Sequence, residues 1–503
     1  RTEDLVFDTA CVDPVTGSTD ACRTVFGDPV GLQPGAPVEP LVLRANAGDC
    51  IEVTLRNALP FTPVIDEDPL SPTFGQVIDR IPDPMPDLAG WQDMMWVVNR
   101  NLNQGVDPVD GQMHFFNNNL IRPSSYVGLH PQLVEYDASR DDGVLVGQNV
   151  PGQVLVTPGE QKQVRWYAGD ISSIPVAGGG NQRRIALVPT PVEFGGVNLL
   201  SADRIKQPQK GLFGALVIEP ADATVTANTQ VPDGQANEAA TPQATRLTRA
   251  QVTVTSDPGD AGSGGTYREA LAIGHKISNI RWADGGAVIN INQGELGREG
   301  AEDSGHAGFN YAMEPSWFRF QLPPDAPFGA GGAPLNQTYG SIENAHAMYA
   351  NQLVTDGNHP NFIPAIDGVS AAGDPQTPVF RTPANMATRM HVLNGASADR
   401  DGTFMLHGHL WQRDPFVCTG AAQDDQVTLP GRCDPDTPVP SLALGLNAQG
   451  KYMGSEEGMG HVFGHWPILF NAGGTDGIAG DYLYRDFAPN GNRNGQFGIL
   501  RVE

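Results

Sequence analysis

The sequence contains no apolar run long enough to cross a membrane as a helix. Its hydrophobic stretches never reach the roughly 18 residues that a span needs, and the first residues show neither the basic start nor the apolar centre of a cleavable secretion signal. We therefore expect no membrane span, and a chain that begins at Arg1 as a mature secreted or periplasmic protein would.

Positive charge is scarce. Lysine and arginine together number 31, against 57 aspartates and glutamates, which gives a net charge of -26. Such a chain repels nucleic acid and anionic membrane surfaces, so neither is expected as a partner. The carboxylates are typical of a solvated acidic surface in salty surroundings. The acidic stretches Asp66–Asp68 and Asp83–Asp87 are candidate calcium-binding segments, although neither has a diagnostic spacing.

Cysteine is also rare, with 5 in 503 residues. Cys11 and Cys22 lie in one loop-like segment and Cys418 and Cys433 bracket another, so two local disulfides are the simplest prediction. They indicate an oxidising compartment. The fifth, Cys50, lies in a strand-like pattern and is expected to be a buried small apolar side chain.

Helical periodicity is scarce as well. The chain has 60 glycines and 42 prolines, and turn dipeptides separate its short apolar segments. This pattern predicts an all-β protein with many loops. At this length the chain can bury more than one hydrophobic core.

Two parts of the chain resemble each other. Strand-like segments follow Pro40 and Pro378, and the step from arginine to asparagine (44 to 57, and 381 to 394) is 13 residues in both. The Gly-x-Phe-Gly segments Gly211–Glu219 and Gly495–Glu503 also match. The repeat predicts two related domains, each a Greek-key β-sandwich or barrel whose strands bury one face.

We place the first domain at 1–222, a linker at 223–248 and the second domain at 249–503. The linker is rich in Ala, Thr, Gln and Pro and has almost no large apolar residues. The second domain carries an insertion at about 295–377, which is too long for a simple turn.

Four segments carry a family resemblance. They are Ala47–Asn57 (AGDCIEVTLRN), Ile205–Pro220 (IKQPQKGLFGALVIEP), Phe404–His409 (FMLHGH) and Gly480–Asp486 (GDYLYRD). They resemble the cupredoxin domains of multicopper oxidases, in the large bacterial multidomain type that includes manganese oxidases. The resemblance implies two cupredoxin-like domains. In such oxidases a blue copper passes electrons to a trinuclear copper centre that reduces oxygen, with thiolate and imidazole ligands.

Most of the family's copper ligands are missing. Laid on the pattern His-Pro-x-His-Leu-His-Gly-His, the blue-copper histidine falls on Gly402, the next on Met405, and only the third on a histidine, His407. His409 matches the last histidine, which is not usually a ligand. No cysteine follows Cys433, so no blue-copper site is expected in this chain.

The histidines of the His-Gly-His stretch have two interpretations. Either His407 and His409 are hydrogen-bonded interior residues inherited from a copper-binding ancestor, or they ligate copper or zinc, within this chain or at an interface. In the second case His461 and His465 are the best partners, because the family's last strands lie beside this one. His391 would complete a set of three or four imidazoles.

The N-terminal half offers only the isolated His114 and His130 to a trinuclear centre. The favoured function is a subunit or fragment of a copper-dependent oxidase without a complete copper centre of its own, with metal ions or phenols as substrates by resemblance only. Its partners would be other subunits or the remainder of a larger oxidase. The alternative is a non-catalytic structural or interaction protein built from degenerate cupredoxin domains.

Overall fold

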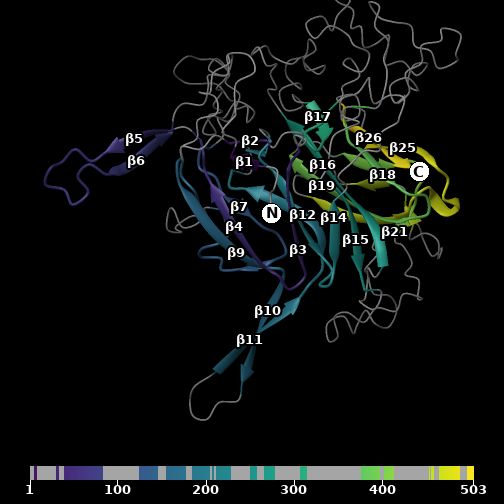
Figure 1. The fold of residues 1–503 in the computed structure, drawn as a ribbon, viewed down its shortest axis with the longest axis horizontal. Coiled ribbons are helices and arrows are strands. Elements are labelled where there is room, and N and C mark those ends of the chain that lie inside the picture. Colours follow the sequence, from purple (N-terminus) through teal and green to yellow (C-terminus); the bar gives the residue numbers. More distant parts are fainter. Residues whose placement is uncertain are drawn as a thin grey trace, which may run out of the picture. The chain divides into compact units, whose positions relative to one another are not determined.

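The computed structural model describes residues 5–7, 30–32, 39–59, 61–82, 124–144, 155–176, 184–203, 207–208, 211–227, 250–257, 265–277, 306–313, 375, 377–396, 402–412, 452–453, 455–457, 464–487 and 495–503. These residues form β-strands and one short 3-10 helix, η8 (Gly474–Asp476), with no α-helix among them (Figure 1). The predicted all-β class, with sandwich-like sheets, is therefore confirmed. None of the described helices is long and apolar enough to cross a membrane.

The chain divides into two compact units. The first comprises Arg1–Glu193, Asn198–Leu216 and Ile277–Gly305, and the second comprises Phe194–Val197, Val217–Lys276 and His306–Glu503. The predicted linker begins with a strand, β14 (Thr224–Ala227), which pairs with β15 (Gln251–Ser256). The rest of the linker lies outside the described residues, as does most of the predicted insertion.

Several small sheets and ribbons contain strands of the first unit. Strands β1 (Leu5–Phe7) and β2 (Val30–Leu32) pair, as do β5 (Phe61–Ile65) and β6 (Val77–Pro82), and β10 (Gly169–Val176) and β11 (Arg184–Pro191). A three-stranded sheet has the order β4 (Cys50–Arg56), β9 (Gln161–Tyr167), β8 (Glu135–Tyr136). A four-stranded sheet has the order β3 (Leu41–Asn46), β13 (Gly214–Glu219), β12 (Gly195–Ser201), β7 (Leu129–His130).

Strand β4 buries one face, as predicted, but Cys50 lies on the other. Ile51, Val53 and Leu55 are half-buried, whereas Cys50 and Glu52 are exposed. The prediction of a buried cysteine was wrong because side chains alternate along a strand, so Cys50 shares its face with Glu52.

Two larger sheets build the second unit. One has the order β14, β15, β16 (Gly265–Ile277), β19 (Ala387–Ala396), β24 (His465–Asn471), with β17 (His306–Phe309) also paired to β16. The other has the order β18 (Val379–Thr382), β26 (Phe497–Val502), β25 (Gly480–Asp486), β20 (Thr403–Leu406), β23 (Ser455–Glu457). Strands β21 (Trp411–Gln412) and β22 (Tyr452–Met453) form a short pair.

Aromatic side chains join these two sheets. The ring of Phe309, on β17, lies 5.2 Å from that of Tyr484 on β25 and 6.4 Å from that of Phe404 on β20, measured between centroids. The ring of Phe380, on β18, stacks on Tyr484 at 5.6 Å. All four are fully buried, so the core of the second unit is an aromatic layer between two sheets.

The sequence repeat has a structural counterpart. In the first copy β3 lies beside β13, and in the second copy β18 lies beside β26, which it pairs with in parallel. In both copies the strand that opens the motif therefore neighbours the Gly-x-Phe-Gly strand that closes it. Short segments far apart in the chain match because they occupy equivalent places in a sheet.

Asn57, which ends the first copy of the motif, ties three segments together. Its Nδ2 donates to the carbonyl oxygens of Ser125 and Val156, both at 2.8 Å, and its Oδ1 accepts from the N–H of Leu59 at 3.1 Å. The side chain is buried. The asparagine is thus needed as a buried hydrogen-bonding group.

We expect Asn57→Ala to lower the free energy of unfolding by about 2–4 kcal/mol, because buried carbonyl groups lose their donor. Denaturant unfolding followed by circular dichroism measures this. The control is Thr54→Ala, an exposed site on β4, which should change stability by less than about 0.5 kcal/mol. Equal effects of the two substitutions would contradict the assigned role.

Candidate functional site

The His-Gly-His stretch begins where a strand ends. Strand β20 stops at Leu406, and Gly408 then takes a left-handed φ of 74°. A Cβ at Gly408 would lie 2.7 Å from the ring of Tyr482, so the turn needs a glycine for two reasons. His407 and His409 are therefore not two residues of one strand, and the turn removes the shared face that a His-x-His metal pair uses.

His409 is a buried hydrogen-bonded residue. Its Nδ1 donates to the carbonyl oxygen of His407 at 3.0 Å, and its Nε2 accepts from the N–H of Gly473 at 3.0 Å. The rings of Phe470 and Tyr482 lie edge-on to it at 4.9 and 4.6 Å. Burial lowers the pKa of His409, and the hydrogen bond to His407 opposes that shift. A neutral imidazole with both nitrogens in use connects this turn to the loop after β24.

His407 lies against an arginine. Its Nε2 accepts a hydrogen bond from Nε of Arg485, on β25, at 3.2 Å. Burial lowers the pKa of His407, and the positive charge of Arg485 lowers it further. The guanidinium uses the lone pair that a metal would need and places a positive charge beside it. This donor set does not fit copper or zinc at Nε2.

His391, on β19, is the centre of a buried polar group. Its Nδ1 accepts from the N–H of Gly196 at 3.1 Å, and its Nε2 lies 3.0 Å from Oε2 of Glu269. Because a backbone N–H can only donate, Nε2 carries the proton that binds the carboxylate. Both nitrogens of this fully buried ring are occupied. His391 thus has no lone pair to offer a metal.

The remaining candidates are divided between two sheets and the undescribed part of the chain. His465 opens β24 and lies opposite Leu393 on β19, in the same sheet as His391. His407 and His409 follow β20, which belongs to the other sheet.

His461 lies outside the described residues, as do the four cysteines of the predicted disulfides, Cys11, Cys22, Cys418 and Cys433. Within the described ranges, no three His, Cys, Asp or Glu side chains are grouped as metal ligands.

The acidic stretch Asp66–Asp68 forms a turn between β5 and β6. The two carboxylate oxygens of Asp66 accept from the N–H of Asp68 at 3.0 Å and the hydroxyl of Thr73 at 2.5 Å. Hydrogen bonds from Ser71, then Thr73, hold the pKa of Asp66 below its usual value. These oxygens thus organise the turn, and calcium binding by Asp66–Asp68 stays a prediction. Asp83–Asp87 lies outside the described residues.

A polar cluster in the first unit was not singled out from the sequence. The hydroxyl of Tyr136 donates to Oδ1 of Asp142 at 3.0 Å, and Nδ1 of His130 lies 3.3 Å from the same oxygen. Burial, followed by Asp142, raises the pKa of Tyr136 to about 12, so the tyrosine remains a donor. His130, Tyr136 and Asp142 match none of the ligand or catalytic motifs sought in the sequence, so no sequence signal identified the cluster.

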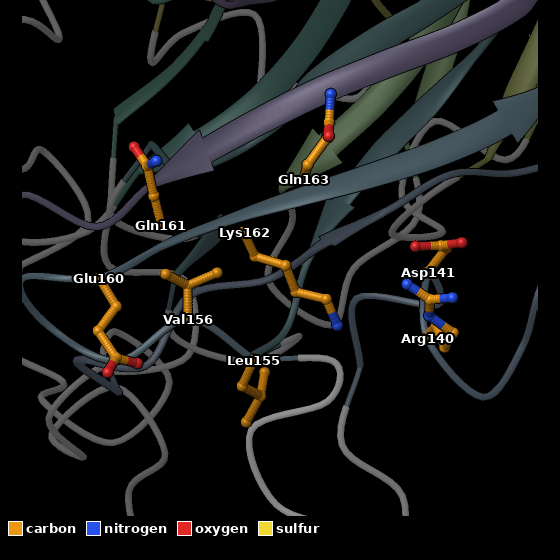
Figure 2. A pocket seen from close by; sticks show the side chains of 8 residues that line it. All are labelled: Arg140, Asp141, Leu155, Val156, Glu160, Gln161, Lys162 and Gln163. Carbon is orange, nitrogen blue, oxygen red and sulfur yellow. The ribbon is translucent and has the colours of Figure 1, made fainter.

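A cavity of about 360 Å³ lies next to this cluster (Figure 2). It is lined by Arg140, Asp141, Leu155, Val156, Glu160, Gln161, Lys162 and Gln163. The amine of Lys162 is buried and has no hydrogen-bond partner among the described residues. The lining comes from two separate parts of the chain, 140–141 and 155–163. No continuous sequence motif therefore marks the cavity.

Comparison with solved structures finds copper enzymes at low similarity. A multicopper oxidase matches with a TM-score of 0.31 and 11% identity, over 75% of this chain and 70% of that chain. Copper nitrite reductase from Nitrosomonas europaea matches at 0.36 and 9%, over 95% and 88%. A copper-containing nitrite reductase from Thermus scotoductus matches at 0.31 and 11%, over 95% and 57%. No protein-family model and no curated protein matches the chain. At these TM-scores the likeness says nothing about chemistry.

We expect Arg485→Met to raise the pKa of His407, because a positive charge and a donor to Nε2 are both removed. Titration of ¹³C-labelled histidine signals by NMR, with His407→Gln for assignment, measures the shift. The control is Arg501→Met, since Arg501 pairs with Asp481 instead. Because the pKa of His407 is lowered in the folded state, the parent chain loses stability as the pH falls below about 6.5. The Arg485 variant should lose less stability than the parent over the same pH range. An unchanged pKa of His407 would contradict this geometry.

We expect Gly196→Ala to destabilise the second unit by about 1–3 kcal/mol through overpacking, because the new Cβ would lie 2.7 Å from Cγ of His391. A double variant with His391→Ala tests whether the clash with the His391 ring is the cause. Thermal unfolding measures the stability of each variant. The double variant should lose less stability than the sum of the two single losses. Strict additivity would mean that the glycine is required for another reason.

Proposed function

We propose that this chain is a non-catalytic structural or interaction protein, built on an oxidase-like plan of two β-domains, whose His-Gly-His stretch stabilises the fold. One observation carries the proposal. The ring nitrogens that a metal would need are already hydrogen-bonded. Nε2 of His407 accepts from Arg485, and Nε2 of His409 accepts from the N–H of Gly473. In His391, Nδ1 accepts from the N–H of Gly196 and Nε2 is bound to Glu269. A metal would have to displace each of these partners.

The displacement would be costly at every position. At His409 it would break the hydrogen bond from Gly473, inside a pocket closed by two aromatic rings. At His391 it would remove the hydrogen bond that Nε2 donates to the buried carboxylate of Glu269, and losing a hydrogen bond to a buried charged group is unfavourable. Imidazole binds copper and zinc well only where its lone pair is available.

The charge of the chain limits the partners that such a protein can have. We place it in a secreted or periplasmic setting, with other subunits or the remainder of a larger oxidase as its partners. A net charge of -26 opposes association with other acidic proteins. Its contacts should therefore depend on screening salt, bridging cations or well-desolvated patches.

A second candidate is a copper-binding subunit of an oxidase that acts on metal ions or phenols. The observation that favours it is the place of His465 on β24, directly beside β19. In that case His465 would ligate copper together with His461 and groups from another chain. His407 and His409 would then be neighbours of the site and not its ligands.

Copper loading separates these proposals. The full chain is incubated with Cu(II) or Cu(I), passed over a chelating column and analysed by plasma mass spectrometry, beside His407→Ala, His409→Ala and His465→Ala. We expect well under one copper per chain in the parent and the same in each variant. His409→Ala should nevertheless lower the melting temperature, because it removes the link between His407 and Gly473.

Two results would overturn the structural role. One copper per chain that is lost in His465→Ala would support the second candidate instead. One copper per chain that is lost in His407→Ala would show that Arg485 leaves Nε2 on metal binding, and would restore the His-Gly-His stretch as a metal site. Near-ultraviolet circular dichroism of each variant checks that a loss of copper is not a loss of fold.

A further inference from the structure

Lys162 buries a charged group in a cavity of the first unit. Its Nζ is inaccessible to solvent and has no hydrogen-bond partner among the described residues. Such a group is costly unless an acceptor reaches it, since a buried donor forfeits its hydrogen bonds to water. Lysine is also rare in this chain, at positions 162, 206, 210, 276 and 451 only. A buried lysine amine is therefore unlike what the composition of this chain would lead one to expect.

The strand directs this amine into the cavity. Along β9, Gln161 and Gln163 are exposed while Lys162 is half-buried, because alternate side chains point to opposite faces. Figure 2 shows the Lys162 side chain extending between Leu155 and the Arg140–Asp141 turn, with Gln161 and Gln163 directed away from it. The cavity is about 360 Å³, large enough for a ligand of several non-hydrogen atoms.

Two cationic and two anionic side chains line the cavity, and the amine of Lys162 is the donor among them that has no acceptor within the described part of the chain. Burial lowers the pKa of Lys162, and Arg140 lowers it too, whereas Asp141 raises it. The carboxylate of Glu160 accepts from the hydroxyl of Thr157 at 2.5 Å and points away from the Lys162 amine in Figure 2. Two cationic side chains thus line the cavity, and one of them has donors to spare.

The walls limit the size and charge of that anion. Leu155 and Val156 give the cavity apolar side chains, and the methylene stem of Lys162 adds to them. Asp141 and Glu160 also line it, so a dianion such as phosphate would be repelled more than a singly charged group. A monoanion with a short apolar body matches both features.

We propose that this cavity binds a small organic monocarboxylate, whose carboxylate accepts hydrogen bonds from Nζ of Lys162 and the guanidinium of Arg140. Its apolar end lies against Leu155 and Val156. The site lies entirely in the first unit and does not depend on the function proposed above.

Ligand-observed saturation-transfer NMR tests the proposal on the full chain, with butyrate, acetate and phosphate as probes. Butyrate should bind saturably and more tightly than acetate, because it has more apolar surface to bury, and phosphate should not compete with it. Lys162→Met should weaken butyrate binding at least about tenfold, in line with the loss of a charge-assisted hydrogen bond. Arg165→Met, further along the same strand and outside the cavity lining, should leave it unchanged.

A second measurement needs no variant. Butyrate at saturating concentration should raise the melting temperature of the parent chain, because it binds the folded state, and acetate should raise it less. Three outcomes would overturn the proposal: no saturable butyrate binding, equal binding by Lys162→Met and the parent chain, or displacement of butyrate by phosphate. An equal rise in melting temperature with sodium chloride at the same ionic strength would do so as well, because it would show a general salt effect.

Discussion

The second unit depends on the requirement that polar groups buried between sheets find their partners inside the protein. His391 shows the requirement most clearly, since one nitrogen receives a backbone N–H and the other gives its proton to Glu269, with no exposed surface on either side chain. Two consecutive glycines, Gly195 and Gly196, leave the space for this ring. A change to any of these groups would leave the others unsatisfied in a medium of low polarity.

The same requirement governs the His-Gly-His stretch. The glycine turn sends His409 towards the Gly473 backbone and leaves His407 facing Arg485. His407 adds a link between the end of β20 and β25, and His409 connects the turn to the loop after β24. Nε2 of each imidazole is thereby used in the hydrogen-bonding framework of the second unit.

The first unit shows the opposite situation. There Asn57 satisfies several backbone groups at once, and Tyr136, His130 and Asp142 satisfy one another. Beside them Lys162 keeps a buried donor without a protein acceptor. A buried donor without a protein acceptor, on a side chain that lines a cavity, is a physical reason to look for a ligand.

The sequence by itself determined the all-β class and the matching strands of the repeat, because these follow from local periodicity and composition. It also singled out the residues around His407. Only the tertiary structure decided what those residues do, since Arg485, Gly473 and Glu269 are 64 or more positions away from the histidines they bind. The same applies to the Lys162 cavity, which forms where separate segments meet. Hydrogen bonding between distant residues leaves no pattern in a single sequence.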